Sequence, residues 1–251
     1  FEDAYSFLLR VRNELHFRST RPVDILHLEK QPEIALGLGY EQDDIFRRVE
    51  AFMGDYYTKA QTIHQLCGIL EERLVHASSG NTSRISFKNV LNAYRSPPLR
   101  KVDEFDLQEG LLSSSDMEIF ENDPERIIRL FRHAQKFKAK LSPDLRALVR
   151  NRLSLIDSTL INSSSANVTF RSILQEVGNV SPILYEMHEL GVLGRFVPEF
   201  GRLSCKVQHD LYHRFTADVH VLHCLRKLDE VFQNKNSKFK HYLEALRKNE
   251  V

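Results

Sequence analysis

The residues best suited to chemistry lie in a run of thirteen near the C-terminal end of the chain. Its three imidazoles and two carboxylates are His209, Asp210, His213, Asp218 and His220. Imidazole and carboxylate groups are the ligands that divalent cations accept in sites for phosphate chemistry. The run therefore indicates the start of a metal-dependent hydrolase, and His220 is its best candidate ligand. The alternative is that these histidines, together with His223, are ordinary surface or capping residues.

The chain ends about thirty residues after His220 and begins at Phe1 rather than at a methionine. A catalytic metal needs several ligands, usually drawn from several elements. We therefore expect an internal piece of a longer protein, in which no catalytic site is complete.

Composition narrows the classes of partner. The chain of 251 residues has 35 basic and 34 acidic side chains and a net charge of +1, so it lacks the charge of a nucleic-acid or membrane-surface protein. Its three cysteines, Cys67, Cys205 and Cys224, have no CxxC spacing and are expected to be reduced thiols. No apolar run reaches the roughly 18 residues that a membrane-spanning helix needs. We expect a cytoplasmic protein with no nucleic-acid or membrane partner.

Apolar residues recur at helical spacing over most of the chain. In the N-terminal part this spacing predicts helices over 2–18, 24–38 and 45–76, with Asp43 or Asp44 capping the third.

Between 77 and 121 the periodicity fails, and a small β-hairpin is expected near 105–112. Helices are expected to restart at Asp123-Pro124 and at Ser142-Pro143, where a cap precedes a proline, and the second should run to about 156. The polar stretch 158–167 reads as a surface loop or a domain boundary.

Helical spacing returns over 170–190, breaks at 191–198, and continues in a last long helix or pair of helices from Leu211 to Phe232. The fold class predicted is all-α, mainly a helical bundle with the one small hairpin. Two domains are expected, 1–157 and 158–251.

Two sequence motifs near the C-terminal end resemble those of a known family. Residues 191–200 read Gly-Val-Leu-Gly-Arg-Phe-Val-Pro-Glu-Phe, and the second motif runs over 208–220. Both resemble the bacterial [protein-PII] uridylyltransferase/uridylyl-removing enzyme at the start of its HD hydrolase domain. The residues matched in the second motif are Gln208, Asp210, His213, Thr216, Asp218 and His220. Phe215 and Ala217 depart from the family's usual tyrosine and valine.

The resemblance implies a role for His220 as the first metal ligand of the HD domain. His209-Asp210 spells the dipeptide that names this superfamily, but it follows Lys206-Val207-Gln208 instead of ending an apolar helix. By resemblance, the dyad and the final aspartate should lie downstream of Val251. Residues 158–251 would then be a linker and the truncated start of the HD domain.

The N-terminal part resembles the same family independently. Segments 4–16, 31–35 with 38–40, and 49–57 are similar to the helical region that follows the nucleotidyltransferase core. Arg12 and His16 lie one helical turn apart and could reach nucleotide phosphates from that core. The alternative for this pair is a solvated helix face with ordinary charges.

The function implied by the resemblance is transfer of UMP from UTP to a tyrosine of the PII nitrogen-signalling protein, and hydrolytic removal of that UMP. It implies Mg²⁺ or Mn²⁺ in the complete protein, and PII and a nucleotide as partners. Two other readings stay open. A different HD phosphohydrolase would share His220 but not the N-terminal segments, and a non-catalytic helical linker or adaptor would have lost one or both activities.

Overall fold

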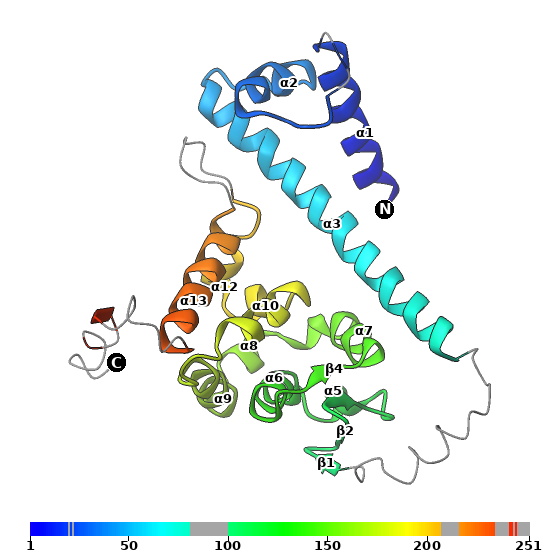
Figure 1. Ribbon diagram of the computed structural model, residues 1–251, viewed down its shortest axis with the longest axis vertical. Helices are drawn as coiled ribbons and strands as arrows, with labels where there is room; N and C mark the ends of the chain where they lie inside the picture. Colours follow the sequence, from blue (N-terminus) through cyan, green and yellow to red (C-terminus); the bar gives the residue numbers. More distant parts are fainter. Residues whose placement is uncertain are drawn as a thin grey trace. The chain divides into compact units, whose positions relative to one another are not determined.

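The computed structural model describes residues 1–19, 21, 23–80, 100–206, 216–233, 241–242 and 244. The chain forms two compact units (Figure 1). The first consists of Phe1–Leu74 and Arg202–His220, and the second of Val75–Gly201 and Val221–Val251. No helix in the described part of the chain has the length and apolarity to cross a membrane.

The first unit is built on α1 (Glu2–Phe17), α2 (Gln31–Gly37) and the long α3 (Ile45–Gly80). Its core joins apolar residues of all three helices, namely Val11, Leu15, Ile34, Ala35, Val49, Phe52 and Met53. The helices predicted over 2–18 and 45–76 are confirmed, and Asp44 caps α3 by accepting a hydrogen bond from the Arg47 N–H at 2.9 Å.

The helix predicted over 24–38 is only partly confirmed. Residues 24–27 are not helical, and a 3₁₀ turn at Leu28–Lys30 leads into α2. Asp24, in this non-helical stretch, pairs with Arg12 and His16 of α1, a contact that local periodicity does not encode.

The second unit contains a sheet of four strands, β1 (Arg100–Val102), β2 (Phe105–Gln108), β3 (Leu111–Ser113) and β4 (Lys140–Leu141), in that order. The first three pair antiparallel, and β4 pairs parallel to β3. The expected hairpin is therefore present as β2 and β3, but it is part of a larger sheet, and the fold is mainly helical rather than all-α.

The extra strands lack a local signal. The β1–β2 turn uses Asp103 and Glu104 at φ of 50° and 68°, without the glycine that usually marks such a turn. β4 has two residues, too few to show an alternating pattern.

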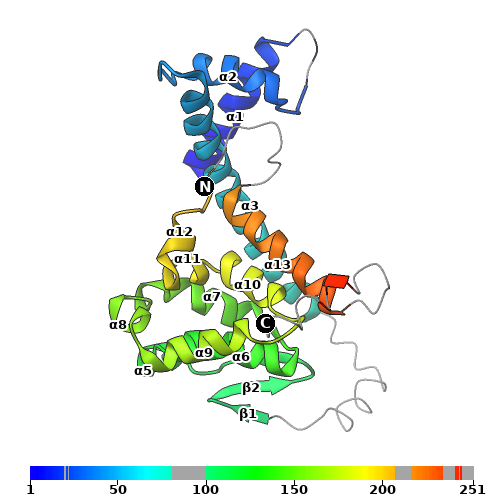
Figure 2. The same cartoon turned by 90° about the vertical axis from the view of Figure 1, so that its left-hand side faces the viewer.

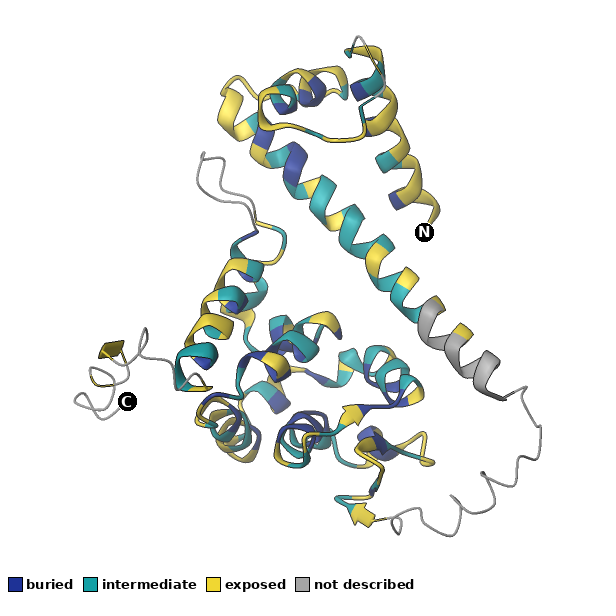
Figure 3. Ribbon diagram, viewed as in Figure 1, coloured by how far each residue is buried: buried dark blue, intermediate teal, exposed yellow. Residues whose placement is uncertain are grey.

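The rest of the described part of this unit is mainly helical. The helices are α5 (Ile119–Asn122), α6 (Arg126–Phe137), α7 (Pro143–Asn151), α8 (Ser158–Ile161), α9 (Ser164–Leu174), α10 (Ser181–Glu189), α11 (Val192–Phe196), α12 (Pro198–Gly201) and α13 (Ala217–Gln233). α6 and α9 lie side by side at the centre of this unit (Figure 2). Their inward faces are the buried ones (Figure 3), with Phe131 and Ile173 fully enclosed.

The prediction of a loop over 158–167 is wrong, because most of these residues are helical and polar residues cap both helices. Asp157 accepts hydrogen bonds from the N–H groups of Thr159 and Leu160, which starts α8, and Ser163 caps α9 through Ala166. The boundary expected at 157/158 falls within the core of the second unit, so it does not coincide with the limits of the compact units. The assignment of 158–251 to an HD domain stays a prediction.

Other boundaries shifted less. Ser142 caps α7 by accepting from the Leu145 N–H, as predicted, but the helix ends at Asn151, and a 3₁₀ turn at Leu153–Leu155 follows. The break expected at 191–198 contains the short helix α11, and Pro198 starts α12.

The connection between α9 and α10 is held by polar side chains from two other helices. Gln135 of α6, 2% exposed, donates from Nε2 to the carbonyl oxygens of Ile173 at 3.0 Å and Asn179 at 2.7 Å. From α13, the buried Asp229 accepts from the N–H groups of Val180 at 3.0 Å and Ser181 at 2.6 Å. This polar clasp joins α6, α9, α10 and α13.

Gly178 lies inside the polar clasp and is required there. Its φ is +76°, a conformation that favours glycine. A Cβ atom at this position would make an ordinary van der Waals contact with Phe232 on α13, at 3.5 Å, so the backbone conformation and not space favours glycine. Gln233 of α13 donates to the Gly178 carbonyl oxygen, which adds a further link between α13 and this connection.

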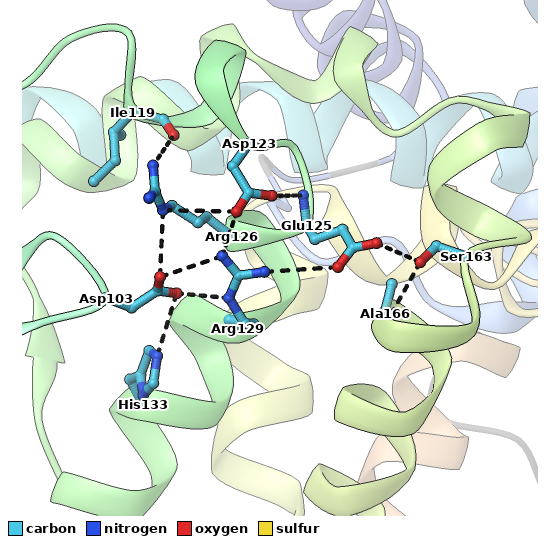
Figure 4. Close-up of polar contacts among 9 residues, drawn as sticks. All are labelled: Asp103, Ile119, Asp123, Glu125, Arg126, Arg129, His133, Ser163 and Ala166. Carbon is cyan, nitrogen blue, oxygen red and sulfur yellow. Dashed lines mark hydrogen bonds and ion pairs between the residues drawn. The ribbon is translucent and has the colours of Figure 1, made fainter.

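A cluster of ion pairs fastens the sheet to α6 (Figure 4). Asp103, in the β1–β2 turn, accepts from Arg129 Nε at 2.6 Å and from Arg126 Nε at 3.3 Å. Arg129 also donates to Asp123 at 2.6 Å. His133 Nε2 lies 3.5 Å from Asp103 Oδ2, and burial lowers the pKa of this histidine.

Replacing Gln135 with methionine is expected to lower the free energy of unfolding by about 2 kcal/mol, because two interior carbonyl groups lose their donor while side-chain volume is kept. Urea denaturation followed by circular dichroism measures this change. The control is Gln175→Met at the exposed C-terminal end of α9, with an expected change within about 0.5 kcal/mol. Equal effects of the two substitutions would contradict the role given to Gln135.

The Asp103 cluster should make stability depend on pH. Burial by itself raises the pKa of the Asp103 carboxyl, but the hydrogen bonds and charge of Arg129, then of Arg126, outweigh it and hold the pKa below its usual value. A lowered folded-state pKa means that the carboxylate stabilises the fold above about pH 4 and that this stabilisation is lost as the pH falls through the folded-state value.

Asp103→Asn should therefore lower the free energy of unfolding at pH 7 by about 1 kcal/mol, and the melting temperature with it. The melting temperature of the variant should also fall less steeply between about pH 5 and pH 3 than that of the wild type. Asparagine tolerates the positive φ of this turn, so backbone strain does not enter. Thermal melts across this range test it. Glu230→Gln, which breaks a solvent-exposed ion pair with Lys227 on α13, should change the curve far less, because such a surface pair contributes little to stability. Parallel curves for wild type and Asp103→Asn would exclude the explanation.

Candidate functional site

His220 lies in the first turn of α13 and has an exposed side chain. Its N–H donates to the Thr216 carbonyl oxygen at 2.9 Å, which fixes the backbone in the helix. Two other motif residues, Thr216 and Asp218, are buried, at 7% and 1% exposure. Among these three residues, His220 is therefore the one that presents its side chain to solvent.

The remaining motif residues, Gln208, Asp210 and His213, lie outside the described residues, as does His209. The predictions made for them stay predictions. The last helix was expected from Leu211, and within the described part of the chain it is α13, which begins at Ala217.

Asp218 connects the start of α13 to the turn that ends at Lys206. Its Oδ2 accepts from the Cys205 N–H at 3.3 Å, and its Oδ1 accepts from the Val219 N–H at 2.9 Å. The Ala217 N–H donates to the Lys206 carbonyl oxygen at 3.0 Å. Residues 205–206 and 217–218 are thus joined by two hydrogen bonds, one of which is accepted by a buried carboxylate.

Cys205 links this turn to α3 within the first unit. Its backbone has φ of +56°, which is uncommon for a residue with a side chain, and its thiol contacts Gln61 Oε1 at 3.2 Å. Burial raises the pKa of the thiol, so Cys205 is held in its unreactive protonated form.

A divalent cation would need more ligands than this region supplies. Across the described residues, no group of three or more His, Cys, Asp or Glu side chains could hold a metal ion. Asp218 is directed at backbone N–H groups, and His220 offers a single imidazole. These residues do not by themselves fit a metal site.

Arg12 and His16 lie on one face of α1, as the sequence predicted, and both contact one carboxylate. Asp24 accepts from Arg12 Nε at 2.8 Å and lies 3.0 Å from His16 Nε2. The hydrogen bonds from Arg12 and His16 lower the pKa of Asp24. A phosphate group approaching this pair would have to compete with Asp24.

A small cavity of about 230 Å³ opens beside this pair. Its lining combines Arg12 and Asp24 with Leu8, Val11, Leu15, Leu26 and Tyr56. The cavity is mostly apolar, and its charged groups are already paired with each other.

Sequence reasoning missed the contacts that place these residues. Asp218 was matched as a motif residue without a role, and nothing local pairs it with Cys205, thirteen positions away. Asp24 carried a usable signal, because an acidic residue just beyond a helix with exposed arginine and histidine is a candidate partner for them. The Asp103 cluster had no such signal, since Asp103 and Arg129 are 26 positions apart.

Comparison with known proteins places both units in one group. The family model described as "GlnD PII-uridylyltransferase" matches residues 1–71, and the model described as "Uridylyltransferase GlnD third domain" matches residues 105–196. No solved structure matches the chain.

Relatives named "Bifunctional uridylyltransferase/uridylyl-removing enzyme" align along nearly the whole chain. The protein of Rhodopseudomonas palustris is 33% identical over 252 residues, and that of Bradyrhizobium sp. strain ORS 278 is 32% identical over 252 residues. In both, the alignment covers 99% of this chain and 27% of the relative. The chain therefore belongs to the family of bifunctional uridylyltransferase/uridylyl-removing enzymes, and it spans about a quarter of the length of these relatives.

Proposed function

We propose that the complete protein transfers UMP from UTP to a tyrosine of a PII signalling protein and removes it again by hydrolysis. The observation that carries this proposal is the alignment of 99% of the chain with relatives whose name states both activities. The proposed partners are PII and the nucleotide, without nucleic acid or membrane, in the cytoplasm. The near balance of charge, +1 over 251 residues, is consistent with a protein partner.

His220 is proposed as a ligand of Mg²⁺ or Mn²⁺ in the uridylyl-removing site, where the cation would activate water. Its exposure at the start of α13 supports this role, since a ligand must reach beyond its own helix. The other ligands would come from outside the described residues.

Arg12 and His16 are proposed to contact nucleotide phosphates in the uridylyltransferase reaction. Asp24 supports this in a specific way, because it holds both side chains on one face of α1 before a ligand arrives. It also opposes binding by occupying the guanidinium. Binding would therefore exchange Asp24 for phosphate.

His220→Ala in the complete protein is expected to lower the rate of uridylyl removal by roughly a hundredfold or more. The loss of a metal ligand should cost at least as much as the loss of a residue that only supports a ligand. Transfer of UMP to PII should be unchanged. The two rates are measured separately with purified PII and uridylylated PII. His223→Ala is the control, since this neighbour on α13 packs its ring against Tyr185, and it should leave both rates in place. Removal that survives His220→Ala would refute the ligand assignment.

The chain by itself is expected to be inactive in both reactions and to hold no cation tightly, because one imidazole cannot fix a metal ion. Titration with Mn²⁺ in a calorimeter should give the same weak response for the 251-residue chain and for its His220→Ala form. A tight site that disappears in the variant would show that a full ligand set already lies within this chain.

A further inference from the structure

We propose that the small cavity beside Arg12 and Asp24 holds the uracil base of UTP during UMP transfer. The inference deepens the proposed function and rests on the phosphate contacts proposed there for Arg12 and His16. It adds a place for the base, which those contacts leave unassigned. All the side chains that carry the inference belong to the first unit.

The first argument is the size and chemistry of the cavity. Its volume is about 230 Å³, and an apolar protein cavity of about 150 Å³ accommodates a benzene ring. One six-membered ring with its exocyclic oxygens and the start of a ribose therefore fits. The walls combine aliphatic side chains of α1 with the aromatic ring of Tyr56 on α3. Ligand sites favour such a lining for the flat, weakly polar part of a molecule.

The second argument is the polar edge of the cavity. Asp24 lines it together with Arg12, and their ion pair is exposed, with 66% of the Asp24 side chain and 56% of the Arg12 side chain accessible. An ion pair in solvent contributes little, so a phosphate group can replace Asp24 as the partner of Arg12. The released carboxylate is then an acceptor at the edge of the cavity. The ring N–H of uracil, which is the only donor of that base in UTP, supplies a matching group.

The third argument is the spacing along α1. Leu8 lines the cavity, whereas His16 lies beyond it and next to Asp24. From Leu8 to His16 the helix rises by about 12 Å, which is comparable with the length of a nucleotide from its base to its outer phosphates. Arg12 lies midway between them. The helix face thus presents an apolar site, a guanidinium and an imidazole in the order in which a nucleotide presents its base and its phosphates.

Filling the cavity in the complete protein tests this. Leu8 lines the cavity, is half-buried and lies outside the set of buried core residues of the first unit, so Leu8→Trp should place an indole in the cavity and keep the fold. We expect KM for UTP in UMP transfer to rise by roughly tenfold or more, the loss that follows when one base no longer stacks in its site. Uridylyl removal, which uses no UTP, should be unchanged.

Leu9→Trp is the matched control. Leu9 is the next residue of α1, is 36% exposed and does not line the cavity, so its substitution should leave KM for UTP unchanged. Tripolyphosphate, which has phosphates but no base, serves as a competitive inhibitor that reports the phosphate contacts alone. Its inhibition constant should be the same in wild type, Leu8→Trp and Leu9→Trp, and should rise in Arg12→Ala.

The outcomes separate the base from the phosphates. An unchanged KM for UTP in a folded Leu8→Trp variant, or equal increases in Leu8→Trp and Leu9→Trp, would overturn the place given to the base. If Arg12→Ala leaves inhibition by tripolyphosphate unchanged, the proposed phosphate contact itself fails.

A second variant covers the case in which Leu8→Trp unfolds or also weakens inhibition by tripolyphosphate. Tyr56→Leu removes the aromatic wall of the cavity without adding volume. A higher KM for UTP with unchanged inhibition by tripolyphosphate in this variant supports the inference, and an unchanged KM contradicts it.

Discussion

The second unit depends on the polar clasp that Gln135 and Asp229 form around the connection between α9 and α10. Backbone groups in such a connection cannot be left unpaired in an interior. One side chain supplies donors to its carbonyl groups, and the other accepts from its N–H groups. Hydrophobic packing alone would allow α6 and α13 to slide over α9 and α10, whereas these hydrogen bonds specify one arrangement.

α13 uses the same interaction near both of its ends. Asp218 and Asp229 are buried carboxylates on one helix, and each accepts hydrogen bonds from backbone N–H groups of another segment. Because each contact has one geometry, the helix is fixed in register within each unit to which it contributes. A helix that carries a proposed ligand at its start gains from this, since packing by apolar residues is less specific about rotation.

Several charged side chains in the described part of the chain are paired with one another. Asp103 takes the guanidinium groups of Arg126 and Arg129, and Asp24 takes Arg12. These ion pairs join segments that are distant in the chain, namely the β1–β2 turn to α6 and the stretch before α2 to α1. The chain covers 27% of the length of each of the two relatives.

The sequence alone determined the long helices, several caps and the family. Apolar residues at helical spacing predict α1 and α3, and Asp44 and Ser142 were predictable as helix caps. The sequence motifs within 191–220 indicate the family. Tertiary structure decided the rest. The strands β1 and β4, the capping roles of Asp157 and Ser163, and the partners of Asp103, Gln135 and Asp218 depend on residues distant in the chain. Local periodicity records which face of an element is buried, but not which distant group a polar side chain will meet.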